Sequence, residues 1–261
     1  MIAQKVVLLG QGIGYSASPA MQAAAFAAAD LEWSYELLDV PPERLAVTLS
    51  QLREEPFVGA NVTIPHKVAV MSRLDEIEGE AVAAGAVNTI RREGQRLIGS
   101  NTDVAGLRAA LATVGLDDCR GRVVVLGGGG SARAAAVALA GADLTFVVRR
   151  PRAAKELPGE IVSWEDAGWK SMVRQADLLI NTTPLGRQGE LPVALADLPA
   201  GGAVIDLVYV AGGTPLIRCA AQARLKREDG WGILLAQGAA AFTTWTGLPA
   251  PLDVMRAALP C

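Results

Sequence analysis

Residues 122–140 read RVVVLGGGGSARAAAVALA, and no other stretch indicates a fold as strongly. A run of β-branched residues, typical of a buried strand, leads into four glycines and then into an alanine-rich segment typical of a helix. In the spacing Gly127-x-Gly129-x-x-Ala132, Gly127 permits a tight turn, Gly129 admits a pyrophosphate, and Ala132 lets helix and strand pack closely. The helix N-terminus presents free N–H groups to phosphates. We therefore predict a dinucleotide-binding strand, turn and helix.

The strand expected next indicates which dinucleotide binds. An NAD site usually carries Asp or Glu about 20 residues beyond the glycine loop, where the carboxylate binds the ribose 2′-hydroxyl. Here the strand LTFVV ends at Arg149 and Arg150, with Arg152 close behind. Guanidinium groups in this place favour a 2′-phosphate and therefore NADP. The alternative interpretation is a solvated basic loop.

Strand-like and helix-like segments alternate along the whole chain. In the first half we expect strands over 5–10, 33–40 and 57–63, helices over 18–30, 41–53, 65–74 and 75–85, and two short strands within 86–103. In the second half we expect further strands over 143–150, 160–164, 176–184 and 202–209, with helices over 214–225 and 232–247. Ser18 is placed to cap the first helix, and Pro19 falls in its first turn. This alternation predicts an α/β fold with mainly parallel sheets.

The composition excludes several functional classes. The chain has 261 residues, 51% hydrophobic and 20% charged, and this length favours two compact lobes over one. A net charge of −3 provides no basic face for nucleic acid or an anionic membrane. No stretch reaches the roughly 18 apolar residues of a membrane span, and the N-terminus enters a strand directly, so we expect a cytoplasmic protein. Three scattered cysteines and one histidine predict no metal.

The run NVTIPHK (61–67) places the single histidine, His66, beside Lys67. An enzyme that oxidises an alcohol needs a group that removes the hydroxyl proton. Lys67 can do this if it is partly desolvated and held by a carboxylate, and Asp103 in GSNTD is a candidate. Spacing alone does not pair the two, and the alternative for any single lysine is a solvated surface residue. In a helix begun by Pro65, neighbours point about 100° apart, so at most one of the two faces a substrate.

The chain resembles the shikimate dehydrogenase family almost from end to end. The matching stretches are YSASP (15–19), GANVTIPHK (59–67), AGAVNTI (84–90), GSNTDVAG (99–106), LGGGGSARA (126–134), DLLINTTPLG (177–186), VIDLVY (204–209) and DGWGILLAQGAAAFTTWTG (229–247). These stretches follow the family's own order. The resemblance is therefore far more specific than the glycine loop alone.

The resemblance implies an N-terminal α/β substrate lobe and a Rossmann-type NADP-binding lobe, with a cleft between them. The substrate-binding domain would comprise residues 1–101, completed by about 237–261, and the NADP-binding domain residues 102–236. The implied activity is the NADP-dependent, reversible reduction of 3-dehydroshikimate to shikimate, a CH–OH oxidoreductase step of aromatic amino acid (chorismate) biosynthesis. We expect a small-molecule substrate, no nucleic acid or membrane partner, and a monomer or homodimer.

The resemblance also assigns site residues. It implies Lys67 and Asp103 as the pair that handles the hydroxyl proton. The implied substrate ligands are Ser16 and Ser18 for the carboxylate, Tyr209 near it, and Asn61, Thr63, Asn88 and Gln237 for the ring hydroxyls. The implied cofactor residues are Gly127, Gly128, Gly129, Gly130, Ser131, Ala132, Arg149, Arg150, Asn181, Thr182, Thr183, Leu207 and Gly230.

Some positions depart from the family pattern. Tyr15 stands where the family usually has His, and Met21-Gln22 stand where it often has His-Asn. None of the departures removes the proposed acid/base pair, but they leave open a quinate or aminoshikimate dehydrogenase. Serine at both 16 and 18 favours shikimate. A ligand sensor without catalysis is a further alternative, and it would be expected to lack Lys67 or Asp103.

Overall fold

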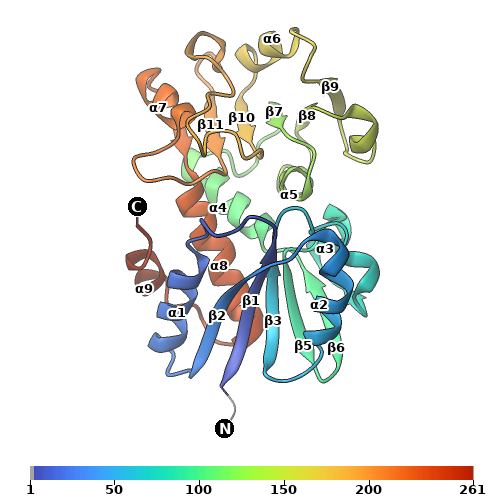
Figure 1. Cartoon of the computed structure of the whole chain (residues 1–261). Helices are drawn as coiled ribbons and strands as arrows, with labels where there is room; N and C mark the ends of the chain where they lie inside the picture. The colour runs from blue at the N-terminus through green and yellow to red at the C-terminus, as the bar shows by residue number, and fades with distance from the viewer. Residues whose placement is uncertain (1–2, 261) are drawn as a thin grey trace. The chain divides into compact units, whose positions relative to one another are not determined.

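The computed structural model describes residues 3–260 and comprises two compact units, and most of their helices and strands are labelled in Figure 1. The first unit contains residues 3–105 and 234–260, and the second contains residues 106–233. The boundaries fall within helices α4 (Asp103–Val114) and α8 (Gly230–Thr246). Each unit has its own six-stranded sheet, so the predicted α/β fold class is confirmed.

The sheet of the first unit is mixed, with the strand order β2-β1-β3-β5-β6-β4. Its strands are β1 (Gln4–Gly10), β2 (Trp33–Asp39), β3 (Phe57–Val62), β4 (Glu76–Ile77), β5 (Thr89–Glu93) and β6 (Arg96–Ser100). The central strand β1 runs parallel to β2 and β3, whereas β5 runs antiparallel to β3 and β6. The two short strands expected within 86–103 are therefore a hairpin.

Helices cover both faces of this sheet because its central strands are apolar on both sides. The helices are α1 (Ser18–Ala28), α2 (Leu45–Gln51), α3 (Glu80–Ala84) and α9 (Leu252–Ala257), together with the second part of α8. On one face, Leu45 and Leu49 of α2 join Val7 and Leu9 of β1 in one buried cluster. Helices α1 and α8 meet through stacked rings of Phe26 and Phe242, 5.8 Å apart.

The helix predicted over 65–74 is wrong. Residues 64–70 form turns without a regular helix, and a short 3₁₀ helix follows at Met71–Arg73. The N–H of His66 bonds back to the Thr63 carbonyl, and the N–H of Val70 bonds to the His66 carbonyl, which leaves isolated turns. His66 and Val70 are buried whereas Val68 is exposed, so tertiary burial, and not a helical repeat, sets the backbone path. The helix predicted over 75–85 is likewise reduced to β4 and the five-residue α3.

The sheet of the second unit is fully parallel, with the strand order β12-β11-β10-β7-β8-β9. Its strands are β7 (Arg122–Leu126), β8 (Asp143–Val148), β9 (Glu160–Ser163), β10 (Leu178–Asn181), β11 (Ala203–Asp206) and β12 (Lys226–Glu228). In chain order this is the doubly wound 3-2-1-4-5-6 arrangement, in which ligands bind at the carboxyl ends where the strand order reverses. That switch point lies between β7 and β10.

The second unit is completed by short helices around an apolar core. They are α5 (Gly130–Ala138), α6 (Trp169–Arg174) and α7 (Pro215–Gln222), in addition to most of α4 and the start of α8. A buried cluster that includes Val124, Leu179 and Val204 joins the strands to Val173 of α6 and Leu216 of α7. Within residues 3–260, no helix is both long and apolar enough to span a membrane.

Candidate active site

Lys67 and Asp103 form an ion pair in the first unit. The distance between Lys67 Nζ and Asp103 Oδ2 is 2.5 Å, and the two side chains are only 12% and 13% exposed. Lys67 follows β3 in the turn described above, and Asp103 is the first residue of α4. A carboxylate at a helix start is stabilised by the partial positive charge of the free N–H groups. The structure therefore brings together two residues that spacing alone could not pair.

Asn88 fixes the second oxygen of the carboxylate. Its Nδ2 donates to Asp103 Oδ1 at 2.7 Å and to Thr102 Oγ1 at 3.0 Å. Its Oδ1 accepts the backbone N–H of Thr102 at 2.7 Å. Because Asn88 is buried and both amide hydrogens are used, it holds the orientation of Asp103, and its predicted contact with a ring hydroxyl stays a prediction.

Asn61 extends this network away from the ion pair. Its Nδ2 donates to the carbonyl of Asn88 at 3.1 Å and to Thr89 Oγ1 at 3.0 Å. Its Oδ1 accepts the hydroxyl hydrogen of Tyr35 at 2.8 Å. Asn61 is 5% exposed, and its predicted role as a substrate ligand is untested by these contacts. In this structure Asn61 links Tyr35 of β2 to Asn88, which holds Asp103.

His66 takes no part in the hydrogen bonds described for this network. Its side chain is 1% exposed, and Nε2 lies 2.6 Å from the backbone carbonyl oxygen of Val40. This contact joins a ring nitrogen of His66 to the backbone just after β2, so His66 has a structural role. The preference for Lys67 over His66 as the candidate acid/base agrees with this geometry.

Four other predicted substrate ligands, Ser16, Ser18, Thr63 and Gln237, also lie in the first unit. Ser16 Oγ accepts the backbone N–H of Ser18 at 3.3 Å. The expected cap by Ser18 is wrong, because α1 begins at Ser18 itself and no side chain caps it. Thr63 follows β3 and is half-buried. Gln237 lies in α8, where its Nε2 donates to the carbonyl of Leu234 at 3.0 Å.

The glycine loop follows β7 in the second unit as predicted. Gly127 has φ +113°, and a Cβ there would lie 2.5 Å from Thr182 Oγ1. Gly129 precedes α5 with φ −89°, and a Cβ there would meet no atom within 4 Å. Ala132 is fully buried. Gly127 is thus required by the fold, whereas Gly129 leaves open space in front of the helix N-terminus where a pyrophosphate would fit.

The register of the parallel sheet aligns the other predicted cofactor residues with this loop. Leu126, Asn181 and Asp206 are paired across β7, β10 and β11. The residues that follow them therefore emerge together at the carboxyl edge. They are Gly127 to Ala132 after β7, Thr182 and Thr183 after β10, and Leu207 after β11. Arg149 and Arg150 follow β8, and both are exposed to solvent.

Gly230 lies against the segment that follows β11. A Cβ at Gly230 would lie 2.5 Å from the carbonyl oxygen of Leu207 and 2.8 Å from the backbone nitrogen of Tyr209. The Tyr209 ring packs on Trp231 with 4.8 Å between centroids. The absence of a side chain at 230 therefore has a packing reason. The predicted proximity of Gly230 to a nicotinamide and of Tyr209 to a substrate carboxylate stays a prediction.

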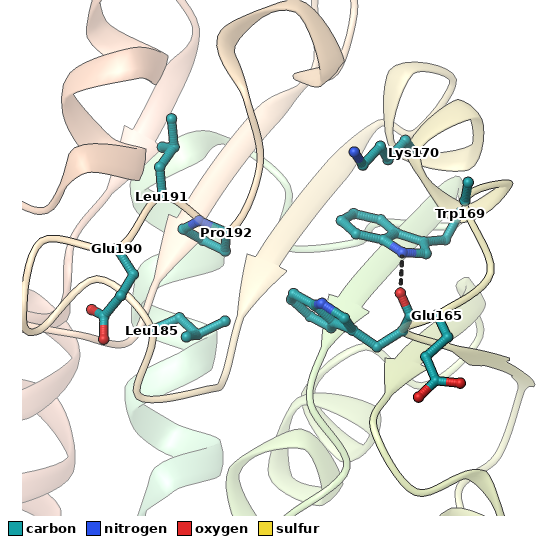
Figure 2. A pocket seen from close by; sticks show the side chains of 9 residues that line it. Glu165, Trp169, Lys170, Leu185, Glu190, Leu191 and Pro192 are labelled. Carbon is teal, nitrogen blue, oxygen red and sulfur yellow. Dashed lines mark hydrogen bonds between the residues drawn. The ribbon is translucent and has the colours of Figure 1, made fainter.

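A pocket of about 390 Å³ lies in the second unit between the segments that follow β9 and β10 (Figure 2). It is lined by Trp164, Glu165, Ala167, Trp169, Lys170, Leu185, Glu190, Leu191 and Pro192. The pKa of the Glu190 carboxyl is lowered by hydrogen bonds from three backbone N–H groups, those of Glu190 itself, Gly186 and Gln188. None of the predicted site residues lines this pocket, although Leu185 belongs to the segment that follows Asn181.

Four further residues hold the two sites together and are not among the predicted site residues. Thr89, Thr102 and Tyr35 complete the hydrogen bonds around Asn88 and Asn61. In the second unit, Asp206 is fully buried at the end of β11. A polar residue in an otherwise apolar strand, as in VIDLVY, is the sequence signal for such a buried carboxylate.

Two parts of the chain match described domain families. Residues 8–90 match the shikimate dehydrogenase substrate binding domain, and residues 230–259 match the shikimate 5′-dehydrogenase C-terminal domain. The shikimate dehydrogenase (NADP(+)) of Moorella thermoacetica is 42% identical, over 96% of this chain and 90% of its own. The protein of the same name from Methanopyrus kandleri is 39% identical, over 97% of this chain and 94% of its own.

Solved structures show the same likeness. Shikimate 5-dehydrogenase from Thermus thermophilus, in complex with NADP(H) and shikimate, is 37% identical with a TM-score of 0.86, and the match covers 98% of both chains. Shikimate dehydrogenase from Aquifex aeolicus is 28% identical with a TM-score of 0.89, covering 98% of this chain and 97% of the other. The likeness extends over nearly the entire length in each case.

Proposed function

The chain belongs to the shikimate dehydrogenase family, and from this premise we propose that it catalyses the NADP-dependent, reversible reduction of 3-dehydroshikimate to shikimate. The observation that carries the proposal is the largely buried ion pair of Lys67 and Asp103, whose geometry Asn88 maintains. A positioned ammonium group of this kind is the proton donor that reduction of a ketone requires.

NADPH, when bound, supplies the hydride that reduces the carbonyl carbon. Lys67 donates the proton to the oxygen that becomes the hydroxyl, and in the reverse direction its neutral amine accepts that proton. Asp103 stabilises the ammonium form and holds Nζ in place, because its own carboxylate is held by Asn88. Lys67 thereby has a defined position for proton transfer in both directions.

The substrate-binding residues that we propose are neutral donors and acceptors. Ser16 and Ser18 would bind the carboxylate, with Tyr209 near it, and Asn61, Thr63, Asn88 and Gln237 would bind ring hydroxyls. Short side chains at the ends of strands and helices lose little conformational entropy on binding a small polyol acid. We also propose that residues 1–101 and about 237–261 bind substrate and that residues 102–236 bind NADP.

The second unit offers the features that NADP requires. Open space at Gly129 in front of α5 suits the pyrophosphate, and the exposed guanidinium groups of Arg149 and Arg150 suit a 2′-phosphate. The remaining proposed cofactor residues are Gly127, Gly128, Gly130, Ser131, Ala132, Asn181, Thr182, Thr183, Leu207 and Gly230. For Asn181 and Thr182 the contribution is through the backbone they shape, because their side chains bond within the protein.

A panel of substrates and cofactors tests the proposal. Shikimate, quinate and aminoshikimate are each incubated with NADP⁺ and with NAD⁺, and the reduced cofactor is followed by its absorbance. We expect the highest kcat/KM for shikimate with NADP⁺. A preference for quinate or aminoshikimate would reassign the substrate on the same scaffold. If shikimate binds but no combination of substrate and cofactor is turned over, the protein is a ligand sensor and not an enzyme.

The proposal also covers location and assembly. We propose that the enzyme acts in the cytoplasm, as a monomer or homodimer, on small molecules and without a nucleic acid partner. Size-exclusion chromatography with light scattering measures the assembly directly, and a tetramer or larger species would contradict this part of the proposal.

A further inference from the structure

We infer that Asp206 is a positioning residue for the cofactor groove, and that it fixes the segments after β10 and β11 in the form that binds NADP. This inference rests on the proposed function and extends it to a residue outside the proposed ligand set. Asp206 is the last residue of β11 and has no exposed surface. A carboxylate in such a place is retained against the cost of burial only if hydrogen bonds satisfy it.

Each carboxylate oxygen of Asp206 accepts hydrogen bonds from a different part of the second unit. Oδ1 accepts Asn181 Nδ2 at 2.9 Å and the backbone N–H of Val208 at 3.1 Å. Oδ2 accepts the hydroxyl hydrogen of Thr214 at 2.6 Å. One buried side chain thus joins the end of β10, the segment after β11 and the start of α7.

Asn181 transmits this anchoring to the segment after β10. Its Nδ2 also donates to the carbonyl of Leu185 at 2.9 Å. Its Oδ1 accepts the backbone N–H of Thr183 at 3.1 Å and the Thr183 hydroxyl at 2.7 Å. Both ends of the Asn181 amide are therefore engaged, and Asp206 selects which end faces inward because a carboxylate accepts only from the NH₂ group. A rotated amide would lose the contacts with Thr183 and Leu185.

Asp206 thus holds two segments, the one that follows β10 and the one that follows β11. Thr183 belongs to the proposed cofactor groove, and the Leu185 side chain lines the pocket drawn in Figure 2. On the other side, the bond from Val208 to Asp206 sets the path of Leu207 to Tyr209, against which Gly230 packs. Loss of the carboxylate would therefore release both segments together.

The contact with Thr214 gives Asp206 a second role that must be separated from the first. Thr214 Oγ1 also accepts the backbone N–H of Ile217 at 3.2 Å and caps α7. A purely structural role would act through this helix and lower stability alone. A positioning role would weaken NADP⁺ binding specifically and would act through the bonds to Asn181 and Val208.

The test uses the full-length Asp206→Ala and Asp206→Asn proteins, with NADP⁺ and shikimate affinities measured by titration calorimetry. Asp206→Ala should raise the Kd for NADP⁺ about tenfold or more, because several buried donors lose their shared acceptor. Asp206→Asn, which keeps one acceptor oxygen, should fall between this variant and wild type. The Kd for shikimate should stay close to the wild-type value in both.

Asp177→Asn is the matched control. Asp177 is exposed and immediately precedes β10, at the amino ends of the strands, where its Oδ2 accepts the backbone N–H of Arg122 at 2.8 Å, and its variant should bind NADP⁺ like wild type. The double variant Asn181→Ala with Asp206→Asn should weaken NADP⁺ binding by less than the sum of the two single effects, because Asp206 acts in part through Asn181.

Three outcomes would overturn the inference. They are a wild-type Kd for NADP⁺ in Asp206→Ala, fully additive effects in the double variant, or an equal loss of NADP⁺ and shikimate binding in folded Asp206→Asn. If Asp206→Ala fails to fold, Asp206→Asn decides, and a wild-type Kd for NADP⁺ in that variant overturns the inference. A wild-type protein that binds no NADP⁺ would instead defeat the proposed function.

Discussion

Lys67 and Asp103, 36 residues apart in the chain, meet with 2.5 Å between Nζ and Oδ2. Asp103 receives a second bond from Asn88, so the lysine pairs with a carboxylate that cannot turn away. A surface ion pair contributes little to stability and would need no such support. The arrangement instead holds one ammonium group in one position, which is what proton transfer to a bound substrate requires.

Substitution of this lysine should separate catalysis from binding. Lys67→Ala is expected to lower kcat by about 10²- to 10⁴-fold, because the proton donor is lost, while the Kd for shikimate changes little. Steady-state kinetics and calorimetry measure the two effects. Lys155→Ala, at an exposed position of the second unit, is the control. Wild-type turnover in Lys67→Ala would remove this residue from the mechanism.

Arg149 should determine the preference between the two nicotinamide cofactors. Arg149→Ala is expected to raise the KM for NADP⁺ about tenfold or more and to leave the KM for NAD⁺ nearly unchanged, because only NADP⁺ carries the 2′-phosphate. Initial rates with both cofactors provide the ratio. Arg256→Ala, an exposed substitution in α9, should alter neither value. Equal changes with both cofactors would argue against a phosphate contact.

Two glycines of the loop should behave differently when a methyl group is added. Gly129→Ala should leave the thermal midpoint unchanged but weaken NADP⁺ binding about tenfold or more, because the methyl group enters open space meant for the pyrophosphate. Gly127→Ala should lower the free energy of unfolding by about 1–3 kcal/mol, because φ is +113° and Thr182 lies too close. Calorimetry and thermal melts distinguish them, and full NADP⁺ affinity in Gly129→Ala would place the pyrophosphate elsewhere.

His66 should matter for stability and not for proton transfer. His66→Ala is expected to lower the free energy of unfolding by about 2–4 kcal/mol, because it leaves a cavity and an unpaired carbonyl at Val40. His66→Gln can place an amide nitrogen near the former Nε2 and should recover part of this loss. Urea unfolding measures the stability, and kcat of the folded variants should stay close to wild type. A fall in kcat as large as that of Lys67→Ala would return His66 to the mechanism.

The buried carboxyl of Asp206 should make stability depend on pH. Burial raises its pKa from 3.8 to about 6, hydrogen bonds from Thr214, Val208 and Asn181 oppose the rise, and the nearby charge of Asp229 adds to it. Between these values the folded protein keeps a proton that the unfolded chain releases. The contribution of Asp206 to stability is therefore greatest below about pH 4 and falls as pH rises through about 6.

Urea unfolding of wild type and Asp206→Asn at several pH values between 4 and 7 measures this contribution. The wild-type protein should lose up to about 3 kcal/mol relative to the variant across this range. All other titrating groups are common to both proteins, so their difference isolates Asp206. A difference that is constant with pH, or that grows in favour of wild type as pH rises, would contradict the assignment.

The spacing of glycines and apolar residues in the sequence predicted much of the fold. Glycine spacing after a β-branched run predicted the strand, turn and helix at 122–140, and these elements are confirmed. Such signals are local, because a tight turn and a helix start depend on residues a few positions apart. The helix predicted over 65–74 is wrong, because burial of His66 and Val70 sets the backbone path there. Of the helix predicted over 75–85, only the five residues of α3 are helical.

What the sequence by itself determined is the α/β class, the glycine loop and, through resemblance to a family, the identity of the candidate residues. Only the tertiary structure decided that Lys67 meets Asp103, that Asn88 holds this carboxylate, and that His66 turns to the main chain. It alone revealed Asp206, whose partners lie in β10 and at the start of α7. The physical reason is that a hydrogen bond between distant residues depends on how strands align and helices pack, and no spacing along the chain encodes that distance.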